Sequence, residues 1–151
     1  MNDLKKNGAR LLLFAVLALA LCVSAFAVPP AVKPFTPIEL VAGSTVIDAV
    51  LYDSATSRAF AAMLPLQVEL WTPADFARAF DLPRRIADEP RTRDFEEGGL
   101  AYWYEGPSVA IFHTHEREET VVPVVTLGKI PAGAGLFKNY EGHVLIRLKE
   151  K

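Results

Sequence analysis

The sequence has 151 residues, of which 16 are Lys or Arg and 18 are Asp or Glu, so its formal net charge is −2 at pH 7. This length suits one domain with a single buried core. Because Lys and Arg are not clustered, the sequence excludes the basic footprint of a nucleic-acid-binding protein.

The first 27 residues predict a secretory signal peptide. Lys5, Lys6 and Arg10 form a basic start, residues 11–23 are almost wholly apolar, and Ala25-Phe26-Ala27 has the small-x-small pattern of a cleavage site. We therefore expect an exported protein, periplasmic or extracellular. Cleavage removes three bases and one acid, which leaves a mature chain with a net charge of −4.

Two alternatives for this segment stay open. Residues 11–27 form an apolar run of 17 residues, the short limit for a membrane helix, so the protein could keep them as an N-terminal membrane anchor. Cys22 could instead be a lipidation site, although the preceding Leu21 is bulkier than the usual residue there. Because Cys22 is the only cysteine, the mature chain has no disulfide and depends on its hydrophobic core.

The next residues predict a tether, a hairpin and a helix. Residues 28–37 contain four prolines and are interpreted as a Pro-rich tether before a folded domain over 38–151. Two β-branched runs, 38–42 and 45–51, flank Gly43-Ser44 and predict a hairpin. A short helix is predicted over 55–64, with Ser54 as its N-cap.

The middle of the chain predicts a strand, a second helix and a loop. Apolar and polar residues alternate over 66–71, which indicates a half-buried strand. Thr72 as a cap and Pro73 at the first helical position predict a short helix that ends near Pro83. Residues 83–99 carry many charges of both signs and predict a solvated loop over one end of the fold.

Four further strands are predicted in the last third of the chain. Residues 100–104 and 108–113 pair across a Glu-Gly-Pro turn, and Pro123 indicates an edge or a bulge in the strand over 121–127. A loop over 128–142 precedes a final strand over 143–148. About seven or eight strands with one or two short helices imply a mainly β fold, a closed or nearly closed barrel.

Four segments resemble the small bacterial cyclophilin-like fold family: LYDSATSRAFAAMLPLQVEL (51–70), LPRRI (82–86), GGLAYWYEGPSVAIF (98–112) and LGKI (127–130). The resemblance spans about 38–148 and implies an eight-stranded β-barrel with helices over its ends. It implies no reaction, because this bacterial family is mostly of unassigned function. Gly99 stands where the family often has Asp.

The resemblance also bears on catalysis. True cyclophilins isomerise X-Pro bonds with an arginine beside an apolar proline pocket and a nearby F-M-x-Q stretch. This sequence has no F-M-x-Q stretch, and neither Arg84 nor Arg85 matches the catalytic arginine. We therefore expect a binding or accessory module of the cell envelope without classical prolyl isomerase catalysis. A degenerate isomerase is the first alternative.

Four residues are candidates for ligand binding. Arg84 and Arg85 could bind a carboxylate or phosphate, or form a solvated face. Tyr102, Trp103 and Tyr104 follow one another in a strand, so their rings alternate between its faces and an exposed ring could line a groove. We name Arg84, Arg85, Tyr102 and Tyr104 as the candidate site for an unknown peptide or small-molecule ligand.

Three residues are candidates for a metal site. His113 and His115 share one face of a strand, and their spacing to Glu119 is similar to the first cupin motif, although both flanking glycines are displaced. Imidazole binds zinc, copper, nickel or iron, and His143 would have to complete the site. We expect no cofactor. A cupin-like protein with a single transition metal is the second alternative, in which these residues converge inside the barrel.

Overall fold

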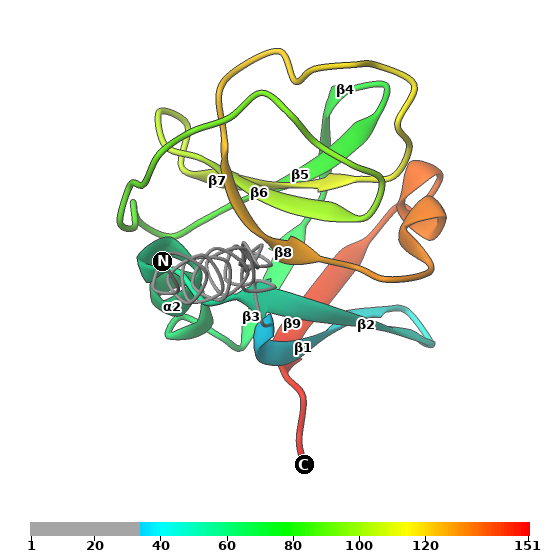
Figure 1. Cartoon of the computed structure of the whole chain (residues 1–151). Helices are drawn as coiled ribbons and strands as arrows, with labels where there is room; N and C mark the ends of the chain where they lie inside the picture. Colours follow the sequence, from blue (N-terminus) through cyan, green and yellow to red (C-terminus); the bar gives the residue numbers. More distant parts are fainter. Residues whose placement is uncertain (1–33) are drawn as a thin grey trace, which may run out of the picture. The chain divides into compact units, whose positions relative to one another are not determined.

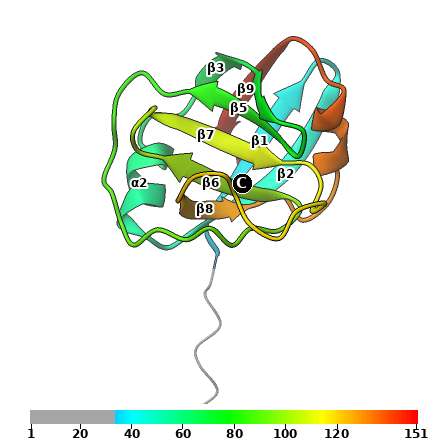
Figure 2. The same cartoon turned by 90° about the horizontal axis from the view of Figure 1, so that it is seen from above.

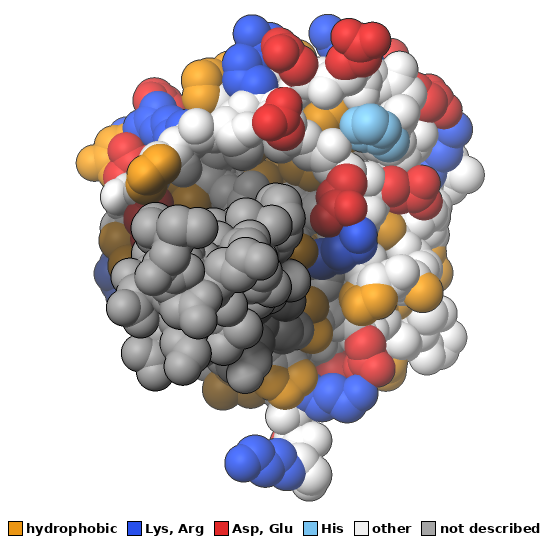
Figure 3. Space-filling model, in the orientation of Figure 1, with side chains coloured by type: hydrophobic (Ala, Val, Ile, Leu, Met, Phe, Trp, Pro, Cys, Tyr) orange, Lys and Arg blue, Asp and Glu red, His pale blue; other side chains and the backbone are white. Residues whose placement is uncertain are grey.

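The computed structural model describes residues 34–151, which belong to one compact unit (Figure 1). The predicted signal peptide and residues 28–33 of the predicted tether lie outside the described residues. Within the described part of the chain, no helix combines the length and the apolarity that a membrane crossing requires. Figure 3 shows Lys and Arg side chains lying among Asp and Glu side chains on one face of this unit.

Nine antiparallel strands form one sheet in the order β3-β9-β1-β2-β8-β6-β7-β5-β4. Within residues 34–151, one α-helix and one 3-10 helix accompany them. The elements are β1 (Pro34–Ala42), β2 (Thr45–Tyr52), α2 (Ala55–Ala61), β3 (Leu66–Glu69), β4 (Trp71–Ala74), β5 (Ala77–Asp81), β6 (Gly99–Trp103), β7 (Ser108–Phe112), β8 (Val125–Lys129), η1 (Ala134–Lys138) and β9 (His143–Leu148).

The sheet closes through a single bent strand. β3 and β4 form opposite edges of the sheet, yet only Leu70 separates them in the chain. β3 pairs with β9, whereas β4 pairs with β5, so the chain itself crosses from one edge to the other. Counted as one strand, β3 and β4 make eight strands around a nearly closed barrel (Figure 2). The predicted mainly β, eight-stranded barrel is confirmed.

Both faces of β6 and β7 are buried. Their inward side chains, such as Leu100 and Ile111, belong to the main core in the barrel interior. Outward residues form a second apolar cluster, which contains Phe76, Ala77, Ala101, Phe112 and Val124. Two segments, 92–96 and 120–124, cover this outer face. We call them the strap.

Backbone hydrogen bonds join the two segments of the strap. Thr92 and Val124 each donate to the other's carbonyl oxygen over 2.9 Å, and Thr120 N donates to Arg93 O over 2.8 Å. The Arg93 guanidinium adds two hydrogen bonds to Thr120 O. The strap is therefore a layer of two hydrogen-bonded segments over part of the sheet.

The helices close opposite ends of the barrel (Figures 1 and 2). In α2, Ser54 Oγ accepts a hydrogen bond from Ser57 N, and Ser57 Oγ donates to Leu127 O of β8 over 2.8 Å. The ring of Phe60 fills the core at this end, and Phe137 of η1 is fully buried. The predicted first helix with Ser54 as its cap is confirmed.

Glu89 fastens the charged loop over 83–98 to α2. Its carboxylate accepts hydrogen bonds from Ala55 N at 3.3 Å and from Thr56 N at 2.8 Å, which are among the N–H groups that the start of a helix leaves without partners. Hydrogen bonds from Thr56, above all, lower the pKa of Glu89 to about 2. A charged loop is thus held in place by a helix cap.

The second predicted helix is wrong. Residues after Thr72 form β4 and β5 instead. β5 pairs along its whole length with β7 and turns Phe80 into the core, and this ladder outweighs the capping signal of Thr72 and Pro73. Pro73 is tolerated because β4 is an edge strand.

The tether prediction is wrong for residues 34–37, because β1 begins at Pro34 and pairs with β2. Pro34 is the first residue of the strand and is followed by a bulge. The carbonyl oxygen of Pro37 accepts a hydrogen bond from Lys149 N, so the proline nitrogen points to the same side, beyond the end of the β9 ladder. Pro37 therefore removes no hydrogen bond between β1 and β2, and Pro34 lies where proline is tolerated, at the start of a strand.

Gly128 gives the first testable consequence. A Cβ atom at this position would lie 2.0 Å from the backbone oxygen of Val50. We expect Gly128→Ala to lower the free energy of unfolding by about 3 kcal/mol or more, because backbone must move to relieve the overlap. Gly135→Ala is the control, since a Cβ there meets nothing within 4 Å. Urea unfolding of both variants measures the difference, and equal stabilities would contradict the close approach of β2 and β8.

Candidate functional site: an outer apolar groove

An apolar groove of about 280 Å³ lies on the outer face of the barrel. None of its lining residues is charged, and only Ser108 and Thr120 carry a hydroxyl group. Both tryptophans of the chain line it. The lining residues are Trp71, Pro73, Ala74, Phe76, Ala77, Ala79, Trp103, Ser108, Ala110, Phe112, Thr120, Val121, Val122 and Val124.

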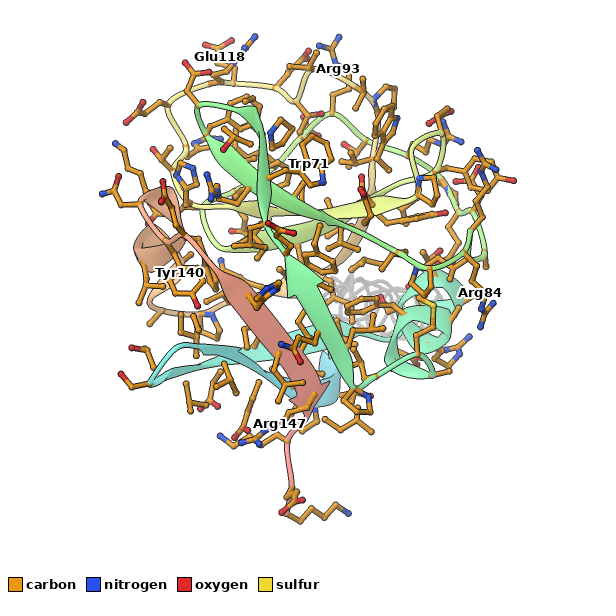
Figure 4. All side chains as sticks on the ribbon, turned by 180° about the vertical axis from the view of Figure 1, so that it is seen from behind. Trp71, Arg84, Arg93, Glu118, Tyr140 and Arg147 are labelled. Atoms are coloured by element: carbon orange, nitrogen blue, oxygen red, sulfur yellow. The ribbon has the colours of Figure 1, made fainter. Side chains whose placement is uncertain are left out.

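Small residues make the groove and aromatic residues wall it. Ala79 of β5 pairs with Ala110 of β7 on one side and with Trp71 of β4 on the other. The alanine methyl groups leave space above the sheet that larger side chains would fill. Trp71 is 38 % exposed, and its indole nitrogen donates to Asp81 Oδ1 over 3.1 Å, which helps to fix the ring. Figure 4 shows Trp71 on the back of the molecule, below the loops that carry Arg93 and Glu118.

The strap forms the opposite wall. Thr120 is buried, and its hydroxyl donates to Val122 O over 2.7 Å, so its polarity is satisfied within the strap. Val121 is 60 % exposed, an unusual degree for a valine. The guanidinium of Arg117 lies 5.5 Å from the centre of the Phe76 ring, which places a positive charge at the rim. Such a groove suits an extended apolar ligand.

The four predicted ligand-binding residues do not line this groove. Tyr102 is fully buried in the barrel, where its hydroxyl accepts a hydrogen bond from Ile86 N over 3.2 Å. Arg85 lies over the ring of Tyr104 and donates to Tyr104 O and Glu105 O. Arg84 is exposed on the α2 side of the barrel (Figure 4). Arg85 and Tyr104 therefore lie together, but the guanidinium of Arg85 stabilises the turn between β6 and β7.

Sequence reasoning considered Trp103 as a ring that could line a groove but named the neighbouring tyrosines for the site, and it missed Trp71. Alternation along β6 could have found Trp103, because Leu100 and Tyr102 face the core and Trp103 therefore faces outward. Trp71 had no such signal, since β4 is only four residues long and contains Pro73. The sequence likewise gives no indication that alanines form the floor of the groove.

The predicted metal ligands lie in different surroundings. His113 is buried, with 5 % of its surface exposed, whereas His115 is exposed and its ring meets Phe95 edge-on. Glu119 forms an ion pair with Arg93 at 3.5 Å, and His143 begins β9 on the surface. Residues 34–151 contain no group of three or more His, Cys, Asp or Glu side chains placed to hold one metal ion. The convergence that a cupin-like site requires is therefore not found.

His113 is a buried, neutral imidazole at the η1 end of the barrel. Its Nδ1 atom is buried and finds no hydrogen-bond partner among residues 34–151. Burial, above all, lowers the pKa of His113 below its ordinary value of 6.5, and the positive charges of Lys138 and Arg78 lower it further. Glu116 and Glu97 act in the opposite direction but more weakly. The protonated form is thus disfavoured in the folded state.

Stability should fall on mild acidification because of His113. The unfolded chain binds a proton near the ordinary histidine pKa, whereas the folded chain binds it only at lower pH, so stability is lost as pH falls between these two values. We expect His113→Leu to flatten the dependence of unfolding free energy on pH from about pH 7 to about pH 5. The exposed His115→Leu is the control and should keep the wild-type slope. Urea unfolding across this range measures both, and an unchanged slope for His113→Leu would contradict the assignment.

Comparisons with known proteins agree with this architecture. The profile of the Cyclophilin-like family matches residues 40–149. No curated protein matches the chain. Among solved structures, the fold is similar to the solution structure of the hypothetical protein AF2241 from Archaeoglobus fulgidus, with a TM-score of 0.61 and 19 % identity over 76 % of this chain and 95 % of that one. The family match covers most of the described barrel, and the chain therefore belongs to the Cyclophilin-like family.

Proposed function

We propose that this protein is an exported binding or accessory module of the cell envelope that holds an extended, apolar segment of a partner polypeptide in its outer groove. One observation carries the proposal: the groove gathers both tryptophans and no charged side chain. Its export rests on the signal-peptide pattern of residues 1–27.

The size of the groove favours a few side chains over a large ligand. Its volume of about 280 Å³ lies just below the range of roughly 300–1,000 Å³ for small-molecule sites. Burying one aliphatic side chain contributes about 1.5–3 kcal/mol, and the loss of translational, rotational and side-chain freedom on association offsets part of this gain, so two such side chains support only weak binding. Weak binding of this kind suits an accessory module.

Tryptophan is a suitable residue for such a wall. Its indole offers a large apolar surface with a single polar atom, and in Trp71 that atom is already bound to Asp81. A partner can therefore cover this ring without leaving its N–H group unsatisfied. The hydroxyl of Ser108 has no hydrogen-bond partner among the described residues, and it is available to a backbone group of the bound segment.

A second candidate function is a degenerate prolyl isomerase. The observation that favours it is Arg117, whose guanidinium lies over Phe76 at the rim of an apolar groove. Neither Arg84 nor Arg85 takes this place. A proline ring would enter the groove, and the arginine would polarise the neighbouring peptide bond.

The binding proposal is tested at Val121. We expect a tryptophan-free peptide with three consecutive leucines, flanked by Gly-Ser, to change the tryptophan fluorescence of the protein. Val121→Glu should weaken this binding about tenfold or more, because a carboxylate would be placed against the apolar segment. Val46→Glu is the matched control, since Val46 is also exposed, at 52 %, but lies on β2 outside the groove.

Equal binding by wild type and Val121→Glu, or equal binding of a peptide with serines in place of leucines, would contradict the proposal. Exchange spectroscopy on an X-Pro tetrapeptide distinguishes the second candidate function, prolyl isomerisation, from binding alone. Acceleration of cis–trans exchange that is lost in Arg117→Gln would establish isomerase activity. Binding without acceleration is the result that the accessory-module proposal expects.

A further inference from the structure

A second cavity, of about 390 Å³, lies over β6 and β8. Residues 92–96 of the strap form one wall, and Phe112 is the only residue that it shares with the groove. The cavity is therefore a separate site on the outer face. Its lining residues are Tyr52, Thr92, Asp94, Phe95, Glu96, Gly99, Leu100, Ala101, Phe112, Thr126 and Gly128.

Aromatic rings and carboxylates meet in this cavity, which distinguishes it from the groove. Tyr52, Phe95 and Phe112 contribute the rings, and those of Phe95 and Phe112 pack 4.6 Å apart at an angle of 45°. Asp94 and Glu96 contribute the carboxylates. The Phe95 ring also packs against Phe76 at 5.1 Å and His115 at 4.9 Å. Negative charge beside aromatic rings is an environment that attracts cations.

The two carboxylates are not equivalent. Glu96 forms an ion pair with Lys129 at 2.6 Å, so its charge is balanced. Asp94 receives no hydrogen bond or ion pair on its carboxylate from any residue within 34–151; only its backbone N–H is bonded, to Thr92 Oγ1. The cavity thus has one unbalanced negative charge, on Asp94.

The tyrosine adds a neutral polar group. Burial raises the pKa of the Tyr52 hydroxyl, and the neighbouring Glu96 raises it further, so the phenol stays protonated at neutral pH. The hydroxyl groups of Tyr52 and Thr126 can both accept hydrogen bonds from an N–H group of a ligand.

Gly99 allows a close approach at the wall of the cavity. A Cβ atom there would lie 3.0 Å from Glu96 O and 3.1 Å from the ring of Phe112, two of the lining residues. A side chain at this position would therefore press on both of these lining residues.

The lining favours an organic cation over a metal ion. A calcium or magnesium ion requires several oxygen ligands around it, and the described residues contain no group of three or more metal-binding side chains. Aromatic and apolar lining residues instead suit the apolar substituents of an ammonium group. We propose that this cavity is a second binding site, which takes a primary or methylated ammonium group carried on an apolar body.

Tetramethylammonium chloride is the probe for this proposal. We expect its titration into the isotope-labelled protein to shift the amide signals of Phe95, Gly99 and Gly128 in a saturable way. Sodium chloride controls for ionic strength, and tert-butyl alcohol controls for apolar size without charge. Saturable shifts with the ammonium salt alone are the expected result.

Two variants locate the binding. Asp94→Asn removes the unbalanced charge from an exposed side chain and should weaken binding about tenfold. Glu97→Gln is the matched control, because Glu97 is exposed nearby but does not line the cavity, and it should bind like wild type. Phe95→Leu keeps an apolar side chain but loses the ring, and it should also weaken binding.

Absence of saturable shifts, equal shifts with sodium chloride or tert-butyl alcohol, or unchanged binding by Asp94→Asn would each overturn the proposal. The groove is tested separately with the same variants. Asp94→Asn should bind the leucine peptide like wild type, so failure at one site is distinguishable from failure at the other.

Discussion

The barrel depends on the close approach of β8 to β2. Only two residue pairs join these strands, Val50 with Lys129 and Leu51 with Gly128, and the missing side chain of Gly128 lets the backbones meet. On the other side of the barrel, the chain itself closes the seam at Leu70. The four strands β3-β9-β1-β2 and the five strands β8-β6-β7-β5-β4 are thus held as one sheet by a narrow junction and a bend. The hydrogen bond from Ser57 in α2 to β8 supports the junction.

A filled interior leaves the outer face for binding. Tyr102, Phe60 and Phe137 are among the large side chains that are fully buried inside the barrel, so the described interior consists of packed side chains. The outer face of β6 and β7 is apolar as well, but the strap covers it only in part. The uncovered parts are the groove with its two tryptophans and the cavity with its unbalanced aspartate. Both candidate sites therefore arise because the two segments of the strap only partly cover strands that are apolar on both faces.

The strand pattern could be predicted from sequence because alternation directly reports which side chains face the core. The prediction failed after Thr72-Pro73, because the capping signal of these residues indicated a helix where the chain forms the ladder between β5 and β7. The site was harder to predict. Alternation places Tyr102 and Trp103 on opposite faces of β6 but does not say which face is the core; the first fills the core and the second lines the groove. The strap could not be foreseen, because it joins residues 27 or more positions apart, such as Arg93 and Thr120, through backbone hydrogen bonds that carry no sequence signature.

The central claim is that the apolar outer face between the strap and β4 holds a partner's apolar segment. Nuclear Overhauser contacts between the methyl groups of a bound leucine peptide and the two indole rings test it most directly. The structure leads us to expect contacts to both Trp71 and Trp103, accompanied by contacts to the alanine methyls of β5 and β7. Contacts confined instead to the loop around Arg84, Arg85 and Tyr104, with none to either indole, would contradict the account.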